Sequence, residues 1–140
     1  MKILLINHFP LEGSGSGTYT RNIAVHLTKL GHQVSIVFPE NVKDINTPEG
    51  IKAHPVFFTK DENIENALPF NFPCFTTHPR STYTFYEMTD LQKNQYLSIF
   101  NREICKEIDE FQPDIIHAQH IWLLSYIVSK LGYPFVVTAH

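Results

Sequence analysis

Histidines and a glycine-rich segment are the residues of this sequence best suited to chemistry. The chain has eight histidines among 140 residues, and three of its six glycines (Gly13, Gly15 and Gly17) lie close together. An imidazole can bind a metal or exchange a proton near neutral pH. Glycines allow the backbone to approach a ligand closely, and the start of a helix favours an anion. Each of these uses depends on where the fold places the residues.

The apolar residues alternate between two periodicities that predict an α/β domain. Apolar runs predict strands at residues 2–6, 33–38, 51–58, 114–118 and 135–139, with Pro39 ending the second. Helical spacing predicts helices over residues 18–30, from a capping box at Thr89 and Gln92 to Pro113, and over 120–131. This alternation predicts a Rossmann-like doubly wound parallel sheet with strand order 3-2-1-4-5 and helices on both faces.

Four histidines fall at the carboxyl ends of the expected strands or just beyond them: His8, His117, His120 and His140. Ligands of doubly wound sheets bind outside these ends, at the point where the strand order reverses. We therefore expect His8, His117 and His120 to line a crevice there, with His140 beside them. The alternative for each is a hydrogen-bonded structural role.

A zinc site built from His117, His120 and His140 is a further alternative. His117 and His120 straddle a strand-to-helix transition, and no carboxylate or thiolate adjoins them. We therefore expect no metal at this edge of the sheet.

The glycine segment, residues 12–18, precedes the first expected helix, where a phosphate is the natural ligand. A flexible loop with Thr18 capping the helix is the alternative. A P-loop is excluded because this segment contains no lysine. The dinucleotide fingerprint G-x-G-x-x-G does not match either, because the third glycine of this segment comes one residue early. Glu40, after the second strand, could stand for the acid that binds a ribose. An NAD-dependent oxidoreductase therefore stays as an alternative.

Composition and charge limit the classes of protein that this chain can represent. The net charge of −3 and the pI of about 6.2 give no basic field for a nucleic acid or an anionic membrane. No apolar run reaches the roughly 18–20 residues that cross a bilayer. The apolar run at the N-terminus is too short for the hydrophobic region of a signal peptide, and no small-residue cleavage site follows it. We expect a cytoplasmic protein with Cys74 and Cys105 reduced, and no feature supports membrane contact.

Residues 59–88 interrupt the alternation of strands and helices. This segment combines Pro69, Pro73 and Pro79 with several phenylalanines and tyrosines. A long connection within a small domain is commonly functional. The two interpretations are a functional loop beside the site and a covering loop that packs on the core.

Both ends of the sequence resemble retaining glycosyltransferases of family 4. The segments that carry the resemblance are GSGTYTRNIA (15–24), LGHQV (30–34), QPDIIHAQH (112–120) and LGYPFVVTAH (131–140). The first two resemble the family's first βαβ unit, and the last two resemble its fourth and fifth strands. Residues 59–88 match nothing in the family pattern.

The resemblance implies one half of a GT-B enzyme, in which two Rossmann-like domains face each other across a cleft. It implies a nucleotide-diphosphate sugar as donor, a sugar or lipid-linked acceptor, and neither a cofactor nor an essential metal. In this family the N-terminal domain mainly holds the acceptor, which residues 59–88 would line or cover. The glycine loop approaches the donor diphosphate, a role that falls on Gly15 and Gly17, and His140 falls near the transferred sugar.

The sequence departs from the family pattern in two respects. Ser14 replaces the first glycine of a frequent Gly-Gly pair, which makes Gly15 the better phosphate contact. The family's C-terminal donor-binding domain is absent, so we expect residues 1–140 to be an N-terminal acceptor-side domain that is inactive alone. The alternative from another class is a stand-alone Rossmann-like module that binds a phosphorylated ligand without chemistry.

Overall fold

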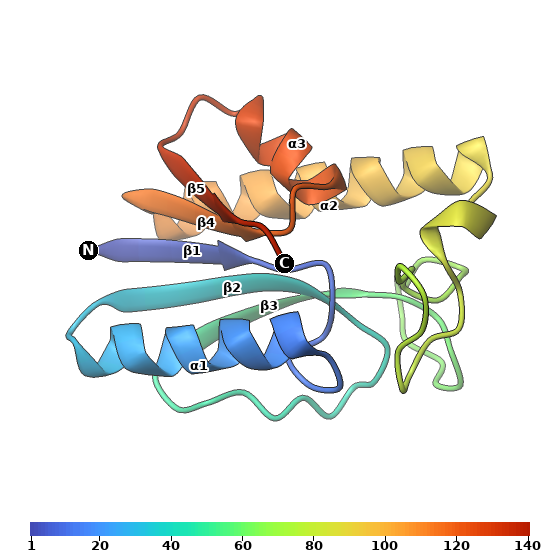
Figure 1. Ribbon diagram of the computed structural model, residues 1–140, viewed down its shortest axis with the longest axis horizontal. Coiled ribbons are helices and arrows are strands. Elements are labelled where there is room, and N and C mark those ends of the chain that lie inside the picture. Colours follow the sequence, from blue (N-terminus) through green and yellow to red (C-terminus); the bar gives the residue numbers. More distant parts are fainter.

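A five-stranded parallel sheet with strand order β3-β2-β1-β4-β5 forms the centre of the molecule (Figure 1), a computed structural model that describes residues 1–140. Its strands are β1 (Lys2–Ile6), β2 (Gln33–Glu40), β3 (Ile51–Phe57), β4 (Ile115–Gln119) and β5 (Phe135–Thr138). Its helices are α1 (Gly15–Lys29), α2 (Asp90–Phe111), α3 (Leu123–Ser129) and the short 3₁₀ helix η1 (Phe85–Glu87). The predicted Rossmann-like order 3-2-1-4-5 is confirmed.

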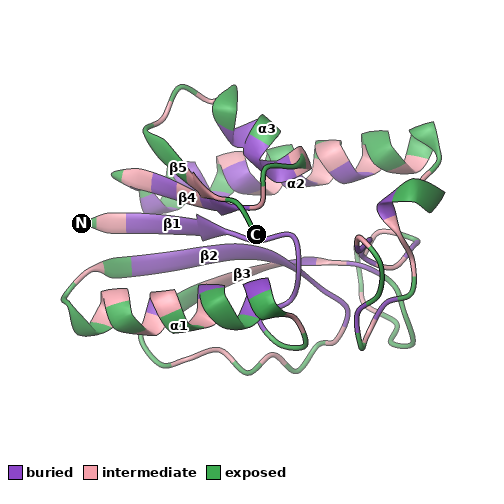
Figure 2. Cartoon of the chain, viewed as in Figure 1, coloured by how far each residue is buried: buried purple, intermediate pink, exposed green.

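The helices cover both faces of the sheet because successive side chains of a strand point to opposite sides. Ile3 and Leu5 of β1 pack in one cluster with Ala24 of α1. Leu4 and Ile6 of the same strand pack in a second cluster with residues of α2 and α3. Figure 2 shows β1 and β2 buried along most of their length, as expected for central strands covered on both faces.

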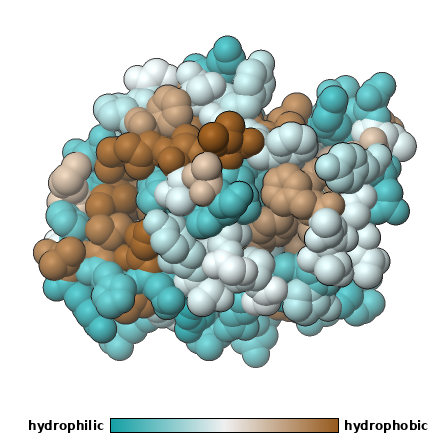
Figure 3. All heavy atoms as spheres, in the orientation of Figure 1, coloured by the Kyte–Doolittle hydropathy of each residue, from teal (hydrophilic) through white to brown (hydrophobic).

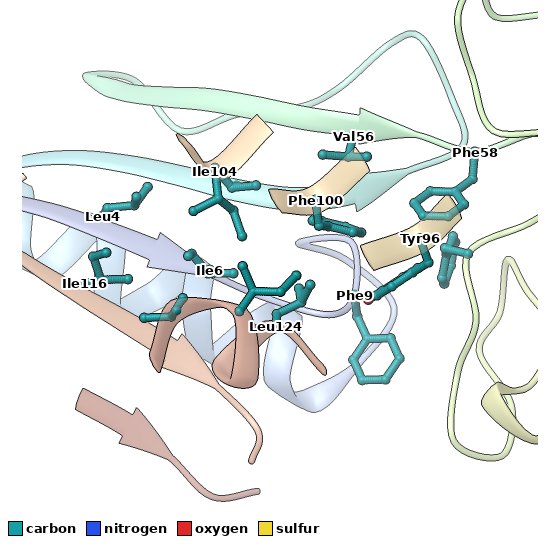
Figure 4. Packing of buried hydrophobic residues seen from close by; sticks show 14 of the residues in the cluster. Leu4, Ile6, Phe9, Val56, Phe58, Tyr96, Phe100, Ile104, Ile116 and Leu124 are labelled. Atoms are coloured by element: carbon teal, nitrogen blue, oxygen red, sulfur yellow. The ribbon is translucent and has the colours of Figure 1, made fainter. Parts of the chain in front are cut away.

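The larger core lies between the sheet and α2 and is rich in aromatic side chains (Figure 4). Phe58, Tyr96 and Phe100 are fully buried, and the rings of Tyr96 and Phe100 lie 4.8 Å apart. Burial of each such side chain contributes about 2–3 kcal/mol. The predicted capping box is present where α2 begins, because Thr89 accepts a hydrogen bond from the amide of Gln92.

Helix α1 begins three residues before the predicted start. Ser14, not Thr18, is the N-cap, and its hydroxyl accepts a hydrogen bond from the amide of Gly17 at 3.0 Å. The glycine segment therefore does not precede the helix. Gly15 and Gly17 lie inside its first turn, which changes what each of them can do.

Two further boundaries differ from the predictions for local reasons. Strand β2 continues through Pro39, which pairs with Val56 of β3. The missing N–H of Pro39 is tolerated because β1 has already ended opposite Val37. Helix α3 begins at Leu123 and not at His120, because His120 adopts a left-handed backbone conformation with φ of 69°.

Residues 59–88 pack against the carboxyl ends of β2 and β3 and against α2. Phe70, Phe72, Cys74 and Phe85 of this segment are buried in the larger core. The covering-loop interpretation is therefore correct for these side chains. Cys74 and Cys105 form no disulfide.

Strand β5 forms one edge of the sheet and leaves apolar side chains exposed. Phe135 and Val136 of this strand and Leu30, just after α1, are exposed. Figure 3 shows apolar atoms gathered on this part of the surface. None of the helices is both long enough and apolar enough to span a bilayer.

Candidate functional site

The carboxyl ends of β1, β4 and β5 meet at one edge of the sheet. Ile6 pairs with Ala118, and Gln119 pairs with Thr138, so the residues that follow these strands are neighbours. A hollow of about 430 Å³ opens there between the end of β5, the β4–α3 turn and the 59–88 segment. Its lining residues are Phe75, His120, Ile121, Trp122, Ala139 and His140.

His140 is an exposed histidine held by three elements of the fold. Its Nε2 atom lies 2.8 Å from Oε1 of Gln119, the last residue of β4. Its ring meets that of Tyr19 of α1 at 5.0 Å and that of His120 at 4.9 Å. The ring is therefore oriented from three sides while one part of it faces the hollow.

His120 lies beside His140, but in an apolar surrounding. Its ring lies between those of Phe9 and Phe75, at 5.4 Å and 5.5 Å, and its Nε2 atom is buried without a partner. Burial and then the neighbouring His140 lower the pKa of His120 to about 4. A neutral imidazole in a strained backbone conformation is typical of a functional position.

His8 does not line the hollow, because it is completely buried. Its Nε2 atom accepts a hydrogen bond from the amide of Leu124 at 3.1 Å, and its Nδ1 atom lies 2.9 Å from the carbonyl oxygen of Gln119. Burial and then the nearby His120 lower the pKa of His8 to about 3. His8 is thus a neutral structural residue that connects β1 with β4 and α3.

His117 points to the α1 face of the sheet and not into the hollow. Its Nε2 atom lies 2.7 Å from the hydroxyl of Thr138. It lines a separate depression beside Ile23 and Leu27 of α1. Burial and then His140 lower its pKa. His117 lies within β4, where successive side chains point to opposite faces of the sheet, and its neighbour Ile116 faces the larger core. His120 lies beyond the end of the strand, so the turn to α3 sets its direction.

The histidines at this edge contact other side chains of the protein. No group of three or more histidine, cysteine, aspartate or glutamate side chains has the geometry to hold an ion. His117 is occupied by Thr138, and His120 and His140 meet ring to ring.

The first turn of α1 offers free backbone amides at the same edge. The N–H groups of Gly15 and Ser16 have no partner in the protein. Gly15 is exposed, and a Cβ atom added to it would meet nothing within 4 Å. This end of the helix suits an anion, because the free amides and the helix dipole both favour negative charge.

Gly17 has a different role from the one expected. Its amide already donates to Ser14, and a Cβ atom added to it would lie 2.1 Å from the carbonyl oxygen of Pro10. Gly17 therefore allows the helix to pack against the preceding loop, and its amide is not available to a phosphate.

Glu40, the residue that could have bound a ribose, is occupied within the protein. It is almost completely buried at the end of β2, where Arg80 forms a two-pronged ion pair with its carboxylate. The amide of Asn41 donates to the same carboxylate at 2.9 Å. A ribose cannot reach this acid without displacing Arg80, which argues against the NAD-dependent oxidoreductase.

Comparison with known proteins agrees with this geometry. The family model described as Glycosyltransferase Family 4 matches residues 13–140. The chain belongs to glycosyltransferase family 4. The matched region contains Gly15, Gln119, His120 and His140, so the hollow and the first turn of α1 lie within it.

Two solved structures share the fold of this family 4 domain. Sucrose-phosphate synthase from Thermosynechococcus elongatus has a TM-score of 0.66 at 14% identity, over 99% of this chain and 33% of its own. The family 4 domain thus spans about a third of that protein. The C-terminal domain of the PF1911 hydrogenase from Pyrococcus furiosus has a TM-score of 0.53 at 11% identity, covering 98% of this chain and 90% of its own. No curated protein matches the sequence.

Two polar residues of the family 4 domain belong to this edge but were missed in the sequence. Asn7 and Gln119 are fully buried and directly follow or end the central strands β1 and β4. The Nδ2 atom of Asn7 and the Nε2 atom of Gln119 have no partner, and neither does the hydroxyl of Ser16 in α1. The available signal in the sequence was a polar residue at the end of an apolar strand. Such a residue lies at the edge of the sheet where ligands of this fold bind, and its polar atoms need partners when it is buried.

Proposed function

We propose that this chain is the acceptor-side domain of a retaining glycosyltransferase. In this proposal the enzyme moves a sugar from a nucleotide-diphosphate sugar to a sugar or lipid-linked acceptor. The observation that carries the proposal is the family match over residues 13–140, which includes the whole edge where α1, β4 and β5 meet. A second domain outside this chain supplies the contacts to the donor nucleotide.

The first turn of α1 is the proposed contact for the donor diphosphate. The free N–H groups of Gly15 and Ser16 point out of the helix start, where the helix dipole is positive. Transfer of the sugar leaves negative charge on the departing diphosphate. Preorganised amides would stabilise this charge as it develops, without a metal ion.

The hollow beside the helix start is the proposed place where the two sugars meet. His140 presents an exposed ring there for a hydrogen bond with a hydroxyl of the transferred sugar. Phe75 and Trp122 line the same hollow, and aromatic faces suit the apolar faces of sugar rings. Phe75 belongs to residues 59–88, so that segment both covers the core and lines the site.

The test uses the longer protein that contains this domain and its donor-binding partner domain. We expect release of nucleoside diphosphate from one member of a panel of UDP-, GDP-, ADP- and dTDP-activated sugars in the presence of acceptor. Gly15→Val and His140→Ala are each expected to lower kcat/KM at least about tenfold. Valine at position 15 keeps the N–H but fills the open space through which the diphosphate would approach, and alanine at position 140 removes the imidazole.

His26→Ala is the matched control, since His26 is an exposed histidine of α1 that forms no side-chain hydrogen bond. It should turn over like the wild type. Wild-type turnover by both Gly15→Val and His140→Ala would show that the site is wrongly placed. Failure of every nucleotide sugar to react would overturn the proposed activity itself.

A further inference from the structure

Gln119 contacts two histidines through two different oxygen atoms. It is fully buried as the last residue of β4. Its carbonyl oxygen lies 2.9 Å from Nδ1 of His8, and its side-chain Oε1 lies 2.8 Å from Nε2 of His140. One residue thus connects a buried histidine with the exposed histidine of the hollow.

The contact with His8 fixes the backbone of Gln119. The amide of Leu124 donates to Nε2 of His8 at 3.1 Å, so this nitrogen carries no proton. The proton of the neutral ring is therefore on Nδ1, which donates to the carbonyl oxygen of Gln119. Since His8 is completely buried, this connection anchors the end of β4 to the start of α3.

The contact with His140 decides which nitrogen of that ring carries the proton. The Oε1 atom of Gln119 has no hydrogen, so it can only accept. Nε2 of His140 must then donate, and Nδ1 of the neutral ring keeps its lone pair. Tyr19 and His120 pack against the same ring and oppose its rotation.

We propose that Gln119 is a positioning residue that holds His140 as the Nε2–H tautomer. Nδ1 of His140 is then the nitrogen that accepts a hydrogen bond from a hydroxyl of the transferred sugar. This second step rests on the proposed function of the hollow. The tautomer itself is a property of the 140-residue chain and can be measured without any sugar or turnover.

The first experiment is ¹⁵N-detected long-range NMR of the histidine rings in this chain at about pH 8, where histidines are neutral. In the wild type, His140 should show a protonated Nε2 and an unprotonated Nδ1. In Gln119→Leu the acceptor is gone, and both tautomers of His140 should be populated. Gln119→Glu keeps an acceptor oxygen at the same place and should restore the single Nε2–H form.

His8 supplies an internal control for the fold of each variant, because its ring forms a hydrogen bond with the backbone carbonyl of residue 119 and not with the side chain. Its Nδ1–H form should persist in Gln119→Leu and Gln119→Glu. Gln33→Leu is the matched control for the substitution, since Gln33 is exposed and forms no side-chain hydrogen bond. An Nδ1–H form of His140 in the wild type overturns the proposal whether or not the variants fold. A tautomer of His140 that is unchanged in folded Gln119→Leu overturns it equally.

The second experiment measures turnover in the longer protein with the nucleotide sugar that supports the wild type. Gln119→Leu should lower kcat about tenfold, the effect of roughly one hydrogen bond, with KM for the donor within about twofold. Gln119→Glu should recover most of that loss. An unchanged kcat in Gln119→Leu, together with a changed tautomer, overturns the positioning role. Failure of the transferase activity itself would leave the NMR result standing, so the two failures can be told apart.

Discussion

Gly15 and Gly17 share the first turn of α1, but their surroundings differ. Gly15 faces open space, whereas Gly17 lies against the carbonyl oxygen of Pro10 and gives its amide to Ser14. Gly17 therefore serves packing, whereas Gly15 is the glycine that we propose contacts the donor diphosphate. Substitution by alanine separates the two roles.

Gly17→Ala is expected to lower the free energy of unfolding by about 3 kcal/mol, because the added methyl group would lie against backbone that cannot move aside easily. Gly15→Ala should change it by no more than about 0.5 kcal/mol, with a gain favoured by helix propensity. Urea denaturation of the 140-residue chain measures both. Equal stability of the two variants would contradict the packing role of Gly17.

His8 and His120 give the stability of the chain a defined dependence on pH. Burial lowers the pKa of His8 to about 3, whereas an unfolded histidine titrates near 6.5. Between these two values the unfolded chain binds more protons than the folded chain, so acidification favours unfolding. The contribution is complete above about pH 6.5 and is lost progressively below it. His120, whose pKa is about 4, acts in the same direction.

The free energy of unfolding should therefore decrease between about pH 6.5 and pH 5, with a slope for His8 that approaches about 1.4 kcal/mol per pH unit toward pH 5. Urea denaturation across this range measures the slope above the region where most carboxylates titrate. His8→Leu should be less stable near neutral pH and have a flatter slope, and His26→Gln should keep the wild-type slope. A wild-type slope in His8→Leu would show that His8 does not cause the dependence.

At the scale of elements, residues 59–88 are held on the sheet by an ion pair whose carboxylate is buried and whose arginine is partly exposed. Arg80 of this segment pairs with Glu40 at the end of β2, and its backbone carbonyl accepts hydrogen bonds from Asn41 and Asn71. The same segment reaches the glycine loop, because Nε2 of His78 donates to the carbonyl oxygen of Glu12 at 3.2 Å. The segment thus connects the end of β2 with the approach to α1.

Arg80→Met is expected to cost about 3 kcal/mol of stability, because it leaves the carboxylate of Glu40 buried without its partner. Amide exchange at Cys74, whose N–H donates to Tyr83 within the segment, should become faster. Adding Glu40→Gln to Arg80→Met should recover part of the loss, since the unpaired charge is then removed.

Lys60→Met is the control for that substitution, because Lys60 pairs only with the exposed Asp61 at 3.6 Å. Its effect should stay below about 0.5 kcal/mol. If Arg80→Met matched Lys60→Met in stability and amide exchange, the ion pair would not be what holds the segment.

At the scale of the whole molecule, two cores share one sheet and leave its carboxyl edge for the site. The smaller core lies under α1 and the larger one under α2 and α3. The site therefore consists of residues at strand ends and helix starts, which the cores hold in place. The proposed contacts to the donor are few on this side, namely the amides of Gly15 and Ser16 and the ring of His140.

The 140-residue chain alone is accordingly expected to bind UDP, GDP or ADP more weakly than about 1 mM, which corresponds to about 4 kcal/mol. Isothermal titration calorimetry measures this directly. The chain alone should also show no sugar transfer. Micromolar binding of one of these nucleotides would instead favour the stand-alone phosphate-binding module.

Much of the fold followed from local patterns in the sequence. The run Lys2–Ile6 is β1 at the predicted residues, and the Thr89–Gln92 capping box opens α2. Strand order followed because right-handed crossovers and buried parallel strands leave few arrangements. The anion-binding potential of Gly15 and the place of His140 at a strand end could also be predicted, since both depend on residue type and position along the chain.

Tertiary structure alone decided which of the predicted site residues can meet a ligand. His8, His117 and His120 are all near strand ends, but one is buried, one points toward α1 and one faces the hollow. The direction and burial of a side chain depend on packing against residues distant in sequence. The partners of Gln119 show this best, because His8 and His140 are brought to it by the register of three strands. The sequence by itself determined the sheet and the edge at which the site is proposed, and the packing of the strands and helices determined which atoms that edge presents.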